Sequence, residues 1–173
     1  RFLSGLLCAG LLLALAPAAA AASPVEISSA EELSLLRETP GGEFVLTADI
    51  DMTGVDWQSA AFSGTLDGGG HTIYNIAVSS LGADRAETVD GNDKRYDTAL
   101  TGFFSALNGA SIRDLTLRGV DISVATPENA YAGVLAGFAS PETALENVCI
   151  YDARLSLTET CQREPEDEHD RCI

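Results

Sequence analysis

Residues 112–124 read IRDLTLRGVDISV, and residues 145–157 read LENVCIYDARLSL. The apolar residues of the two stretches coincide one for one at an offset of 33 residues. Within each stretch they alternate with polar residues in two short runs, which is typical of strands that bury one face. Both stretches are rich in Val, Ile, Leu and Thr and are bounded by turn-forming residues, so the repeat predicts an all-β protein.

The spacing between the runs predicts how the chain turns. From Ile112 to Leu115, and from Leu117 to Val120, the step between apolar residues is three instead of two. We expect a corner at each such step, because the chain must turn there to keep its apolar residues inward. Two corners give three short strands per coil, and stacked coils of this kind form a parallel β-helix with coils about 4.8 Å apart.

A third copy of the repeat is expected at residues 73–78, which read IYNIAV, at an offset of 39 from Ile112. This alignment places Asn75, Asp114 and Asn147 at the same corner. Asn and Asp tolerate a left-handed backbone and bond to neighbouring amides, so we interpret the three as a structural ladder of corner residues. A row of side chains that binds a ligand is the alternative interpretation.

The N-terminus indicates export. Residues 1–22 contain one Arg, an apolar core and an alanine run with Ala-x-Ala triplets, which are the parts of a secretory signal peptide. The apolar core is shorter than the roughly 20 residues of a membrane span, which makes an uncleaved anchor the weaker alternative. We therefore expect membrane contact only through the signal peptide before its cleavage, and a secreted or cell-surface location.

The mature chain divides into three parts. Residues 23–40 carry a Ser-x-x-Glu capping box, and we expect a short helix there, over 29–38, that caps the first coil. Residues 41–160 form the β-helix module, and within it 82–100 are charged and poor in apolar residues, which predicts an inserted loop. Residues 161–173 are a polar tail, which we interpret as truncated.

Charge and cysteine content bear on the partners and the compartment. The net charge is −16, from 10 Lys and Arg against 26 Asp and Glu. Nucleic acid and anionic membranes need a basic surface, so neither is expected as a partner. Outside the cell such carboxylates can bind Ca²⁺, although solubility explains the charge as well. Cys161 and Cys172 are a candidate disulfide, since export places them where disulfides persist, and Cys149 is then free or paired outside this chain.

The sequence offers few candidate sites. Asp49 and Asp51 lie two apart in an extended segment, so both side chains point to one face and could belong to a Ca²⁺ site or an acid/base pair. Asp90 and Asp93 lie in the stretch DGND, which matches part of a calcium loop without the ligand spacing of an EF-hand. Simple solvation is the competing interpretation of both pairs. His71 has no evident partner, and no serine or cysteine has a recognisable base, so we predict no catalytic residue and no required cofactor.

Several phrases occur in a particular order along the chain: SAEEL at 29–33, FVLTADIDM at 44–52, FSGTLDGGGHTI at 62–73, TGFF at 101–104 and GVLAG at 133–137. In this order the chain resembles bacterial secreted and surface proteins with GLUG-type repeats. The resemblance implies the opening coils of a right-handed parallel β-helix of the pectate-lyase-like superfold. The repeat departs from the family pattern at Ser105 and Ala136, where Gly is common.

We therefore predict a non-catalytic secreted or cell-surface β-helix module with an adhesion, display or structural role. The alternative is the N-terminal accessory region of a larger secreted enzyme, either a glycan-active β-helix enzyme or a surface metallopeptidase. Recognition of a host protein, a matrix protein or a glycan is expected at 82–100, the largest departure from the repeat. A surface loop without a partner is the competing interpretation of that segment.

Overall fold

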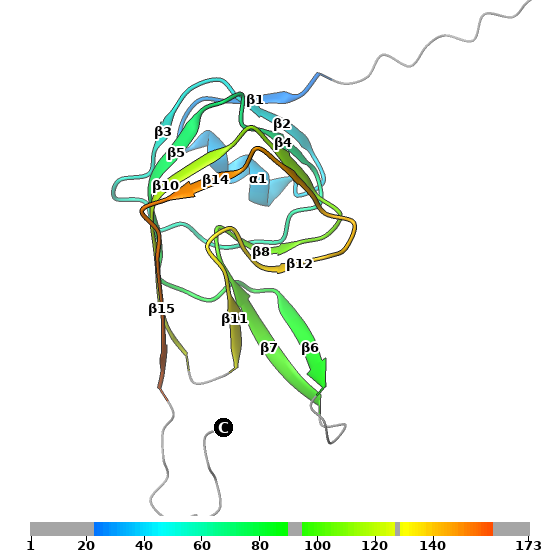
Figure 1. Cartoon of the computed structure of the whole chain (residues 1–173), viewed down its shortest axis with the longest axis vertical. Coiled ribbons are helices and arrows are strands. Elements are labelled where there is room, and N and C mark those ends of the chain that lie inside the picture. Colours follow the sequence, from blue (N-terminus) through cyan, green and yellow to red (C-terminus); the bar gives the residue numbers. More distant parts are fainter. Residues whose placement is uncertain (1–22, 90–94, 127–128, 161–173) are drawn as a thin grey trace, which may run out of the picture.

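The computed structural model describes residues 23–89, 95–126 and 129–160. Strands make up 52% of these residues and most of them pair in parallel, so the expected all-β class is confirmed. The described part of the chain has one short α-helix, preceded by a short 3-10 helix. Figure 1 shows the strands grouped into sheets, with the helix on the side of the N-terminal strands.

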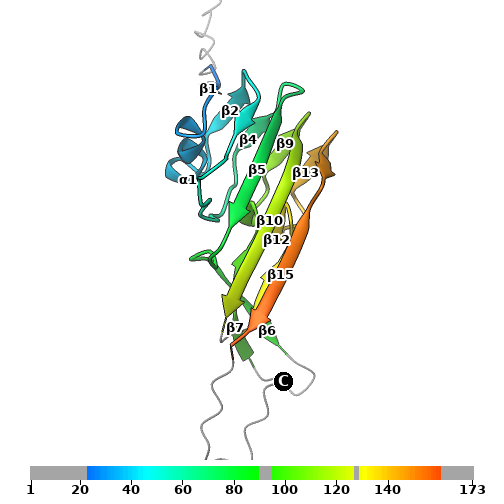
Figure 2. The same cartoon turned by 90° about the vertical axis from the view of Figure 1, so that its left-hand side faces the viewer.

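Two five-stranded sheets form the body of the molecule. The first contains β1 (Val25–Ile27), β2 (Glu43–Leu46), β4 (Thr65–Asp67), β9 (Ser111–Arg113) and β13 (Ala144–Glu146). The second contains β3 (Ile50–Asp51), β5 (Thr72–Val78), β10 (Thr116–Thr126), β14 (Cys149–Tyr151) and β15 (Arg154–Glu159). In both sheets the neighbours follow the order of the chain and pair in parallel, as Figure 2 shows for β5, β10 and β15. From β2 onward, each circuit of the chain therefore adds to the first sheet and then to the second.

A third group of strands completes the circuits. β8 (Phe104–Leu107) pairs in parallel with β12 (Ala136–Ala139), where Phe104 meets Ala136 at an offset of 32. β7 (Arg95–Thr101) pairs in parallel with β11 (Ala130–Ala132), where Ala99 meets Ala130 at an offset of 31. Both offsets are close to the repeat of 33 residues, so these strands also join successive circuits.

The core consists of apolar side chains that stack from circuit to circuit. The inward positions predicted for β10 and the corner before it are confirmed, since these four side chains are at most 1% exposed: Leu115, Leu117, Val120 and Ile122. The equivalent positions of the last circuit are in register but open to solvent, with Ile150 39% and Leu155 42% exposed. Val148 is partly buried against the core. The exposure follows from position, because β13, β14 and β15 are the last strands of their sheets among the described residues.

The second corner predicted for each coil is wrong. β10 runs without interruption from Thr116 to Thr126, across the predicted corner at Gly119. Gly119 has a φ of +62°, and a single residue in the left-handed region resets the alternation of a strand without reversing its direction. The step of three therefore marks a left-handed bend within one strand, which we call the bulge. It is repeated in register, since Arg118 and Val120 pair with β5 at the same offset of 44. Asp114, with a φ of +50°, lies instead at a true corner between β9 and β10.

The predicted alignment of the third copy is also wrong. Ile73 pairs with Leu117, an offset of 44, and not with Ile112. The error has a simple cause. The apolar residues of IYNIAV match the spacing of the corner at Ile112 and the spacing of the bulge at Leu117 equally well. Only pairing in space distinguishes the two registers.

The corner ladder is correspondingly smaller than predicted. Asp114 and Asn147 do share a corner, and the Asn147 amide donates a hydrogen bond of 2.9 Å to the Asp114 carboxylate. Asn75, the third expected member, lies instead on β5 beside Gly119 in the bulge row, with a φ of +59°.

The N-terminal cap is shorter than the continuous helix expected over 29–38. A 3-10 turn at Glu32–Ser34 leads directly into α1 at Leu35–Glu38. Ser29 Oγ accepts the Glu32 N–H at 3.2 Å, as in a capping box, whereas the Glu32 carboxylate accepts the N–H of Ser28, at 2.8 Å, and not that of Ser29. These contacts, with the Ser28 backbone bond first, lower the pKa of Glu32.

The cap segment packs its leucines into the core. Leu33 and Leu36 are at most 1% exposed and belong to the common core. Residues 23–40 also hold a strand, because β1 precedes the cap and pairs in parallel with β2. The β-sheet body therefore begins before the predicted boundary at 41.

Residues 82–100 contain a β-hairpin where a structureless loop was predicted. β6 (Arg85–Val89) pairs antiparallel with β7, which in turn joins β11. Thr98, Ala99 and Leu100 are at most 2% exposed, so the end of the hairpin belongs to the packed interior. Backbone hydrogen bonds hold these two strands together. Backbone pairing does not require apolar side chains, so the polar composition of 82–100 did not predict it.

Several predictions lie outside the described residues. These are the signal peptide at 1–22, the tail at 161–173 with its candidate disulfide Cys161–Cys172, and the calcium candidates Asp90 and Asp93. Within the described part of the chain, no helix combines the length and apolar character needed to cross a membrane.

Candidate functional site

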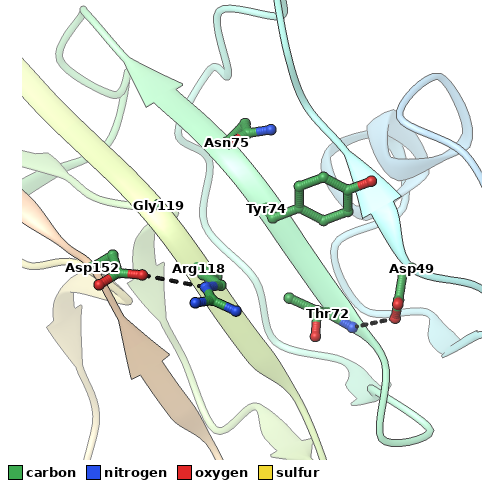
Figure 3. Close-up of a pocket in the computed structure, with 7 residues that line it drawn as sticks. All are labelled: Asp49, Thr72, Tyr74, Asn75, Arg118, Gly119 and Asp152. Atoms are coloured by element: carbon green, nitrogen blue, oxygen red, sulfur yellow. Dashed lines mark hydrogen bonds and ion pairs between the residues drawn. The ribbon is translucent and has the colours of Figure 1, made fainter.

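The outer face of the second sheet carries an open hollow of about 440 Å³, shown in Figure 3. Its walls come from four segments of the chain: the loop before β3, and strands β5 and β10 with the turn after β14. Six of its seven lining residues have polar side chains: Asp49, Thr72, Tyr74, Asn75, Arg118 and Asp152. The seventh is Gly119, which has no side chain.

Strand register gathers these side chains from distant parts of the chain. Tyr74 of β5 pairs with Arg118 of β10, which pairs with Tyr151 of β14. Paired positions of neighbouring strands point to the same face of a sheet. Tyr74 and Tyr151 therefore stand on either side of Arg118 in one row of the outer face. Tyr74 lines the hollow, and Tyr151 lies beside it.

The bulge residues form the next row across the same face. Asn75, Gly119 and Asp152 all have positive φ angles, of +59°, +62° and +54°. Because the middle member has no side chain, the surface is left open between the side chains of the outer two, as Figure 3 shows. The repeated bulge thus contributes to the hollow as well as to the path of the strands.

Arg118 supplies the positive charge among the lining residues. Its Nε donates to Oδ2 of Asp152 at 3.2 Å, and the two side chains are 64% and 69% exposed. Exposed ion pairs of this kind contribute little to stability, about 0–1 kcal/mol. The two terminal nitrogens of Arg118 have no hydrogen-bond partner among the described residues. They remain available to a ligand.

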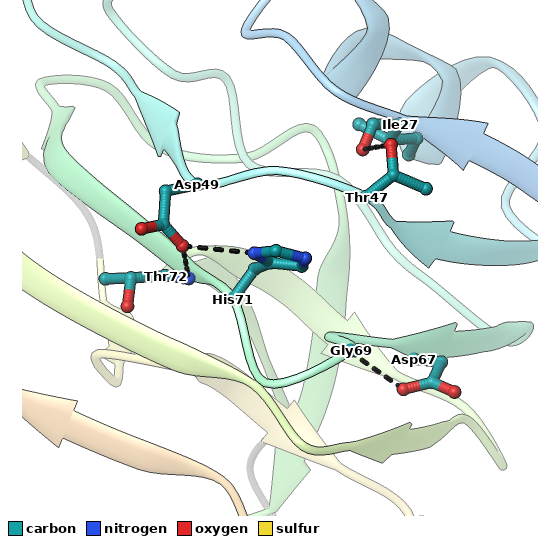
Figure 4. A network of polar contacts seen from close by, with 7 residues as sticks. All are labelled: Ile27, Thr47, Asp49, Asp67, Gly69, His71 and Thr72. Carbon is teal, nitrogen blue, oxygen red and sulfur yellow. Dashed lines mark hydrogen bonds and ion pairs between the residues drawn. The ribbon is translucent and has the colours of Figure 1, made fainter.

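Asp49 lies at the other side of the hollow, in the network shown in Figure 4. Its Oδ1 accepts the Thr72 N–H at 2.8 Å and lies 3.3 Å from Nδ1 of His71. The Thr72 hydrogen bond, followed by the His71 contact, lowers the pKa of Asp49 from its usual 3.8. The carboxylate is therefore ionised at neutral pH. The sequence predicts no partner for His71, and the structure supplies one.

Asp51, the second calcium candidate of this segment, is engaged in a separate network. It accepts hydrogen bonds from the Thr53 hydroxyl at 2.7 Å and from the Asn75 amide at 2.9 Å. The Thr53 hydroxyl, followed by Asn75, lowers the pKa of Asp51. Asp49 and Asp51 are both exposed, in agreement with the predicted common face.

The residues that the structure describes contain no group of three or more His, Cys, Asp or Glu side chains that could hold a metal ion. The Ca²⁺ candidates therefore stay predictions. Cys149 is exposed and forms no disulfide within the described ranges.

Asp84 ties the base of the hairpin to the body of the protein. Its Oδ2 accepts the Ala61 N–H at 3.0 Å and also the hydroxyl of Ser105, which is fully buried. The Ser105 hydroxyl has this carboxylate as its partner, so Asp84 satisfies a polar group inside the protein. The sequence places Asp84 in a solvated loop and gives no sign of this role.

The hollow is suited to hydrogen bonding and stacking. Tyr74 presents a ring and a hydroxyl, and Arg118 presents its terminal nitrogens. Asp49 and Asp152 each keep one carboxylate oxygen without a partner among the described residues. No serine or cysteine of the described residues donates a hydrogen bond to a histidine, and His71 contacts the carboxylate of Asp49.

The sequence contains a signal for some of these contacts. Asp49 and Thr72 are 23 residues apart, and Asp51 and Asn75 are 24 apart. This spacing matches the circuit from Ile50 to Ile73 in the second sheet. This circuit differs in length from the repeat of 33, so the repeat does not predict these contacts. Likewise, Tyr74 pairs with Arg118 at an offset of 44, which the repeat does not predict.

Comparison with known proteins gives one partial similarity. No protein-family model matches the chain, and no solved structure matches it. Among curated proteins, the chain is similar to halomucin of Haloquadratum walsbyi, with 34% identity over 85 residues. The match takes in 39% of this chain and 1% of halomucin, so the chain spans a very small part of the length of that protein. The resemblance to GLUG-type repeats and the bacterial source stay predictions.

Proposed function

We propose that the chain is a non-catalytic module of a secreted or cell-surface protein, built as a right-handed parallel β-helix with an adhesion, display or structural role. The strand order carries the proposal. In both five-stranded sheets each circuit adds a strand in parallel register beside the previous one. Repeats of this kind are stabilised by contacts between neighbouring units and extend by adding units. That property suits a scaffold.

The last described circuit supports the same proposal. Its apolar side chains that are in register with the core are 39–51% exposed: Leu145, Ile150, Leu155 and Leu157. In a module that grows by stacking, these are the side chains that a further circuit covers.

Three observations support the proposed location and partners. The partial similarity to halomucin agrees with a secreted or cell-surface protein, and so does the acidic composition of the chain. The hairpin within 82–100 departs most from the repeated circuits, so we retain it as a candidate element for recognising a host protein, a matrix protein or a glycan.

A duplicated circuit tests the architecture. Residues 111–143 span one repeat from the start of β9 to the residue before β13, and a second copy inserted after 143 adds one circuit. The longer protein should fold and have a higher free energy of unfolding, because each added unit brings a new interface. A longer protein that unfolds or aggregates would overturn the β-helix proposal.

Antibody labelling tests the location. An antibody against residues 23–160 should label intact source cells or detect the protein in the medium. Detection only after lysis, together with a cytosolic marker protein, would contradict a secreted or surface location.

A further inference from the structure

We infer that the hollow on the outer face of the second sheet binds a neutral oligosaccharide. The inference rests on the proposed function and deepens it, since it names the ligand class of a surface module and the residues that contact it. Three features carry it: the row of Tyr74, Arg118 and Tyr151 across the sheet face, the unused hydrogen-bonding groups of the hollow, and the charge of the hollow.

The tyrosines suit a chain of sugar rings. Tyr74 is half-buried and Tyr151 is 55% exposed, and they lie on either side of Arg118 in one row across three strands. Two strand spacings separate their backbones by about 9.6 Å, roughly the length of two linked pyranose rings. Tyrosine combines an apolar ring with a polar hydroxyl, which suits the apolar faces and polar edges of sugars. The row therefore runs across the strands and fits an oligosaccharide better than a single sugar.

The unused polar groups match sugar hydroxyls. The donors are the terminal nitrogens of Arg118 and the hydroxyls of Tyr74 and Thr72, none of which has a partner among the described residues. The acceptors are the second carboxylate oxygens of Asp49 and Asp152. A sugar hydroxyl both donates and accepts, as a serine hydroxyl does, so it can use donors and acceptors at once. An apolar ligand would leave both sets unpaired.

The charge selects a neutral ligand. Two carboxylates and one guanidinium line the hollow, on a chain of net charge −16. A uronic acid or a sulfated sugar would bring its negative charge close to Asp49 and Asp152. A cationic ligand would meet Arg118 between the two tyrosines. A neutral sugar avoids both repulsions and can still bond to all three charged side chains.

Gly119 provides a specific way to close the hollow without disturbing the strand. A Cβ at this position would lie 3.5 Å from Asn75 Oδ1, which is an ordinary contact distance. The neighbouring bulge residues are Asn75 and Asp152, with nearly the same φ. Asparagine should therefore be tolerated at Gly119, because it accepts the left-handed region, and its side chain would occupy the open floor.

Calorimetric titration of the full chain tests the inference. The probes are the linear hexaoses of glucose, mannose and galactose, with hexagalacturonate as the acidic comparison. We expect at least one neutral hexaose to bind with a Kd of about 0.1–1 mM and the acidic hexaose to bind at least about tenfold more weakly. Arg118→Ala and Gly119→Asn should each weaken the neutral interaction by about tenfold or more.

Arg113→Ala is the matched control. Arg113 is also a half-exposed arginine paired with a carboxylate, Asp67, but it lies on the first sheet, away from the hollow. The Arg113→Ala variant should bind the neutral hexaose as tightly as the unchanged protein. Equal unfolding midpoints would show that each variant is folded, and Tyr74→Ala would replace Gly119→Asn if that variant failed to fold.

The inference is overturned if none of the three neutral hexaoses binds up to about 10 mM. It is also overturned by tighter binding of hexagalacturonate, or by equal losses in Arg118→Ala and Arg113→Ala. None of these outcomes bears on the duplicated-circuit or labelling experiments, so a failure of the ligand assignment is distinguishable from a failure of the proposed function.

Discussion

Truncating a leucine in the middle of the stacked circuits should lower the free energy of unfolding much more than truncating a leucine of the last circuit. Leu117 is fully buried and lies between the circuits of Ile73 and Ile150. Leu155 pairs with Ile122 on one side only and is 42% exposed. The same chemical change, Leu→Ala, therefore isolates the effect of being covered by a further circuit.

The expected magnitudes follow from burial. Leu117→Ala removes buried methyl groups and leaves a cavity closed by the neighbouring circuits, which costs about 3–5 kcal/mol in such cores. At Leu155 much of the side chain already contacts water, so the transfer contribution falls to about 1 kcal/mol. The cavity contribution is absent because the position opens to solvent. The difference between the two variants should therefore be about 2 kcal/mol or more.

Urea unfolding followed by circular dichroism measures both values. The midpoint should shift strongly for Leu117→Ala and weakly for Leu155→Ala, with similar slopes, because the slope reports the surface exposed on unfolding. Equal costs, or a larger cost at Leu155, would refute the reasoning, since the end of the stack would then be covered in solution. Measurement at two protein concentrations shows whether a second copy provides that cover.

Three further predictions follow from the polar contacts and the cap. Asp84→Ala should lower the free energy of unfolding by about 1–3 kcal/mol, because a buried hydroxyl loses its partner, whereas Asp97→Ala in the exposed hairpin should change it by less than about 0.5 kcal/mol in the same urea assay. The folded-state pKa of Asp49 is lowered, so its ionised form stabilises the fold above the unfolded pKa, and this contribution is lost as the pH falls through the folded pKa. In Asp49→Asn, the free energy of unfolding should therefore fall less steeply as the pH drops to and below the usual carboxyl pKa of 3.8. The same pH dependence in the variant and the unchanged protein would contradict this assignment. Deleting residues 23–40 should cause aggregation in size-exclusion chromatography, because it uncovers the first circuit and a strand edge, and a monomeric folded product would rule out the capping role.

Much of the body of the protein could be predicted from local pattern. Alternation at Leu115, Leu117, Val120 and Ile122 identified the buried face, because a pleated strand points successive side chains to opposite sides. The capping box at Ser29 located the helix for a similar reason, since its contacts span only three or four residues. The hairpin was not predicted, because its strands are defined by backbone pairing and not by apolar side chains.

Local sequence pattern was enough to locate the strands that carry alternating apolar residues, and to predict which of their side chains face inward. Tertiary structure alone decided that one step of three is a corner at Asp114 and another is a bulge at Gly119, because both restore the inward face with the same spacing. It also decided that Tyr74, Arg118 and Asp152 share one hollow. Side chains more than thirty residues apart meet only when the register between circuits is set, and that register depends on the length of chain, including the hairpin, that each circuit contains.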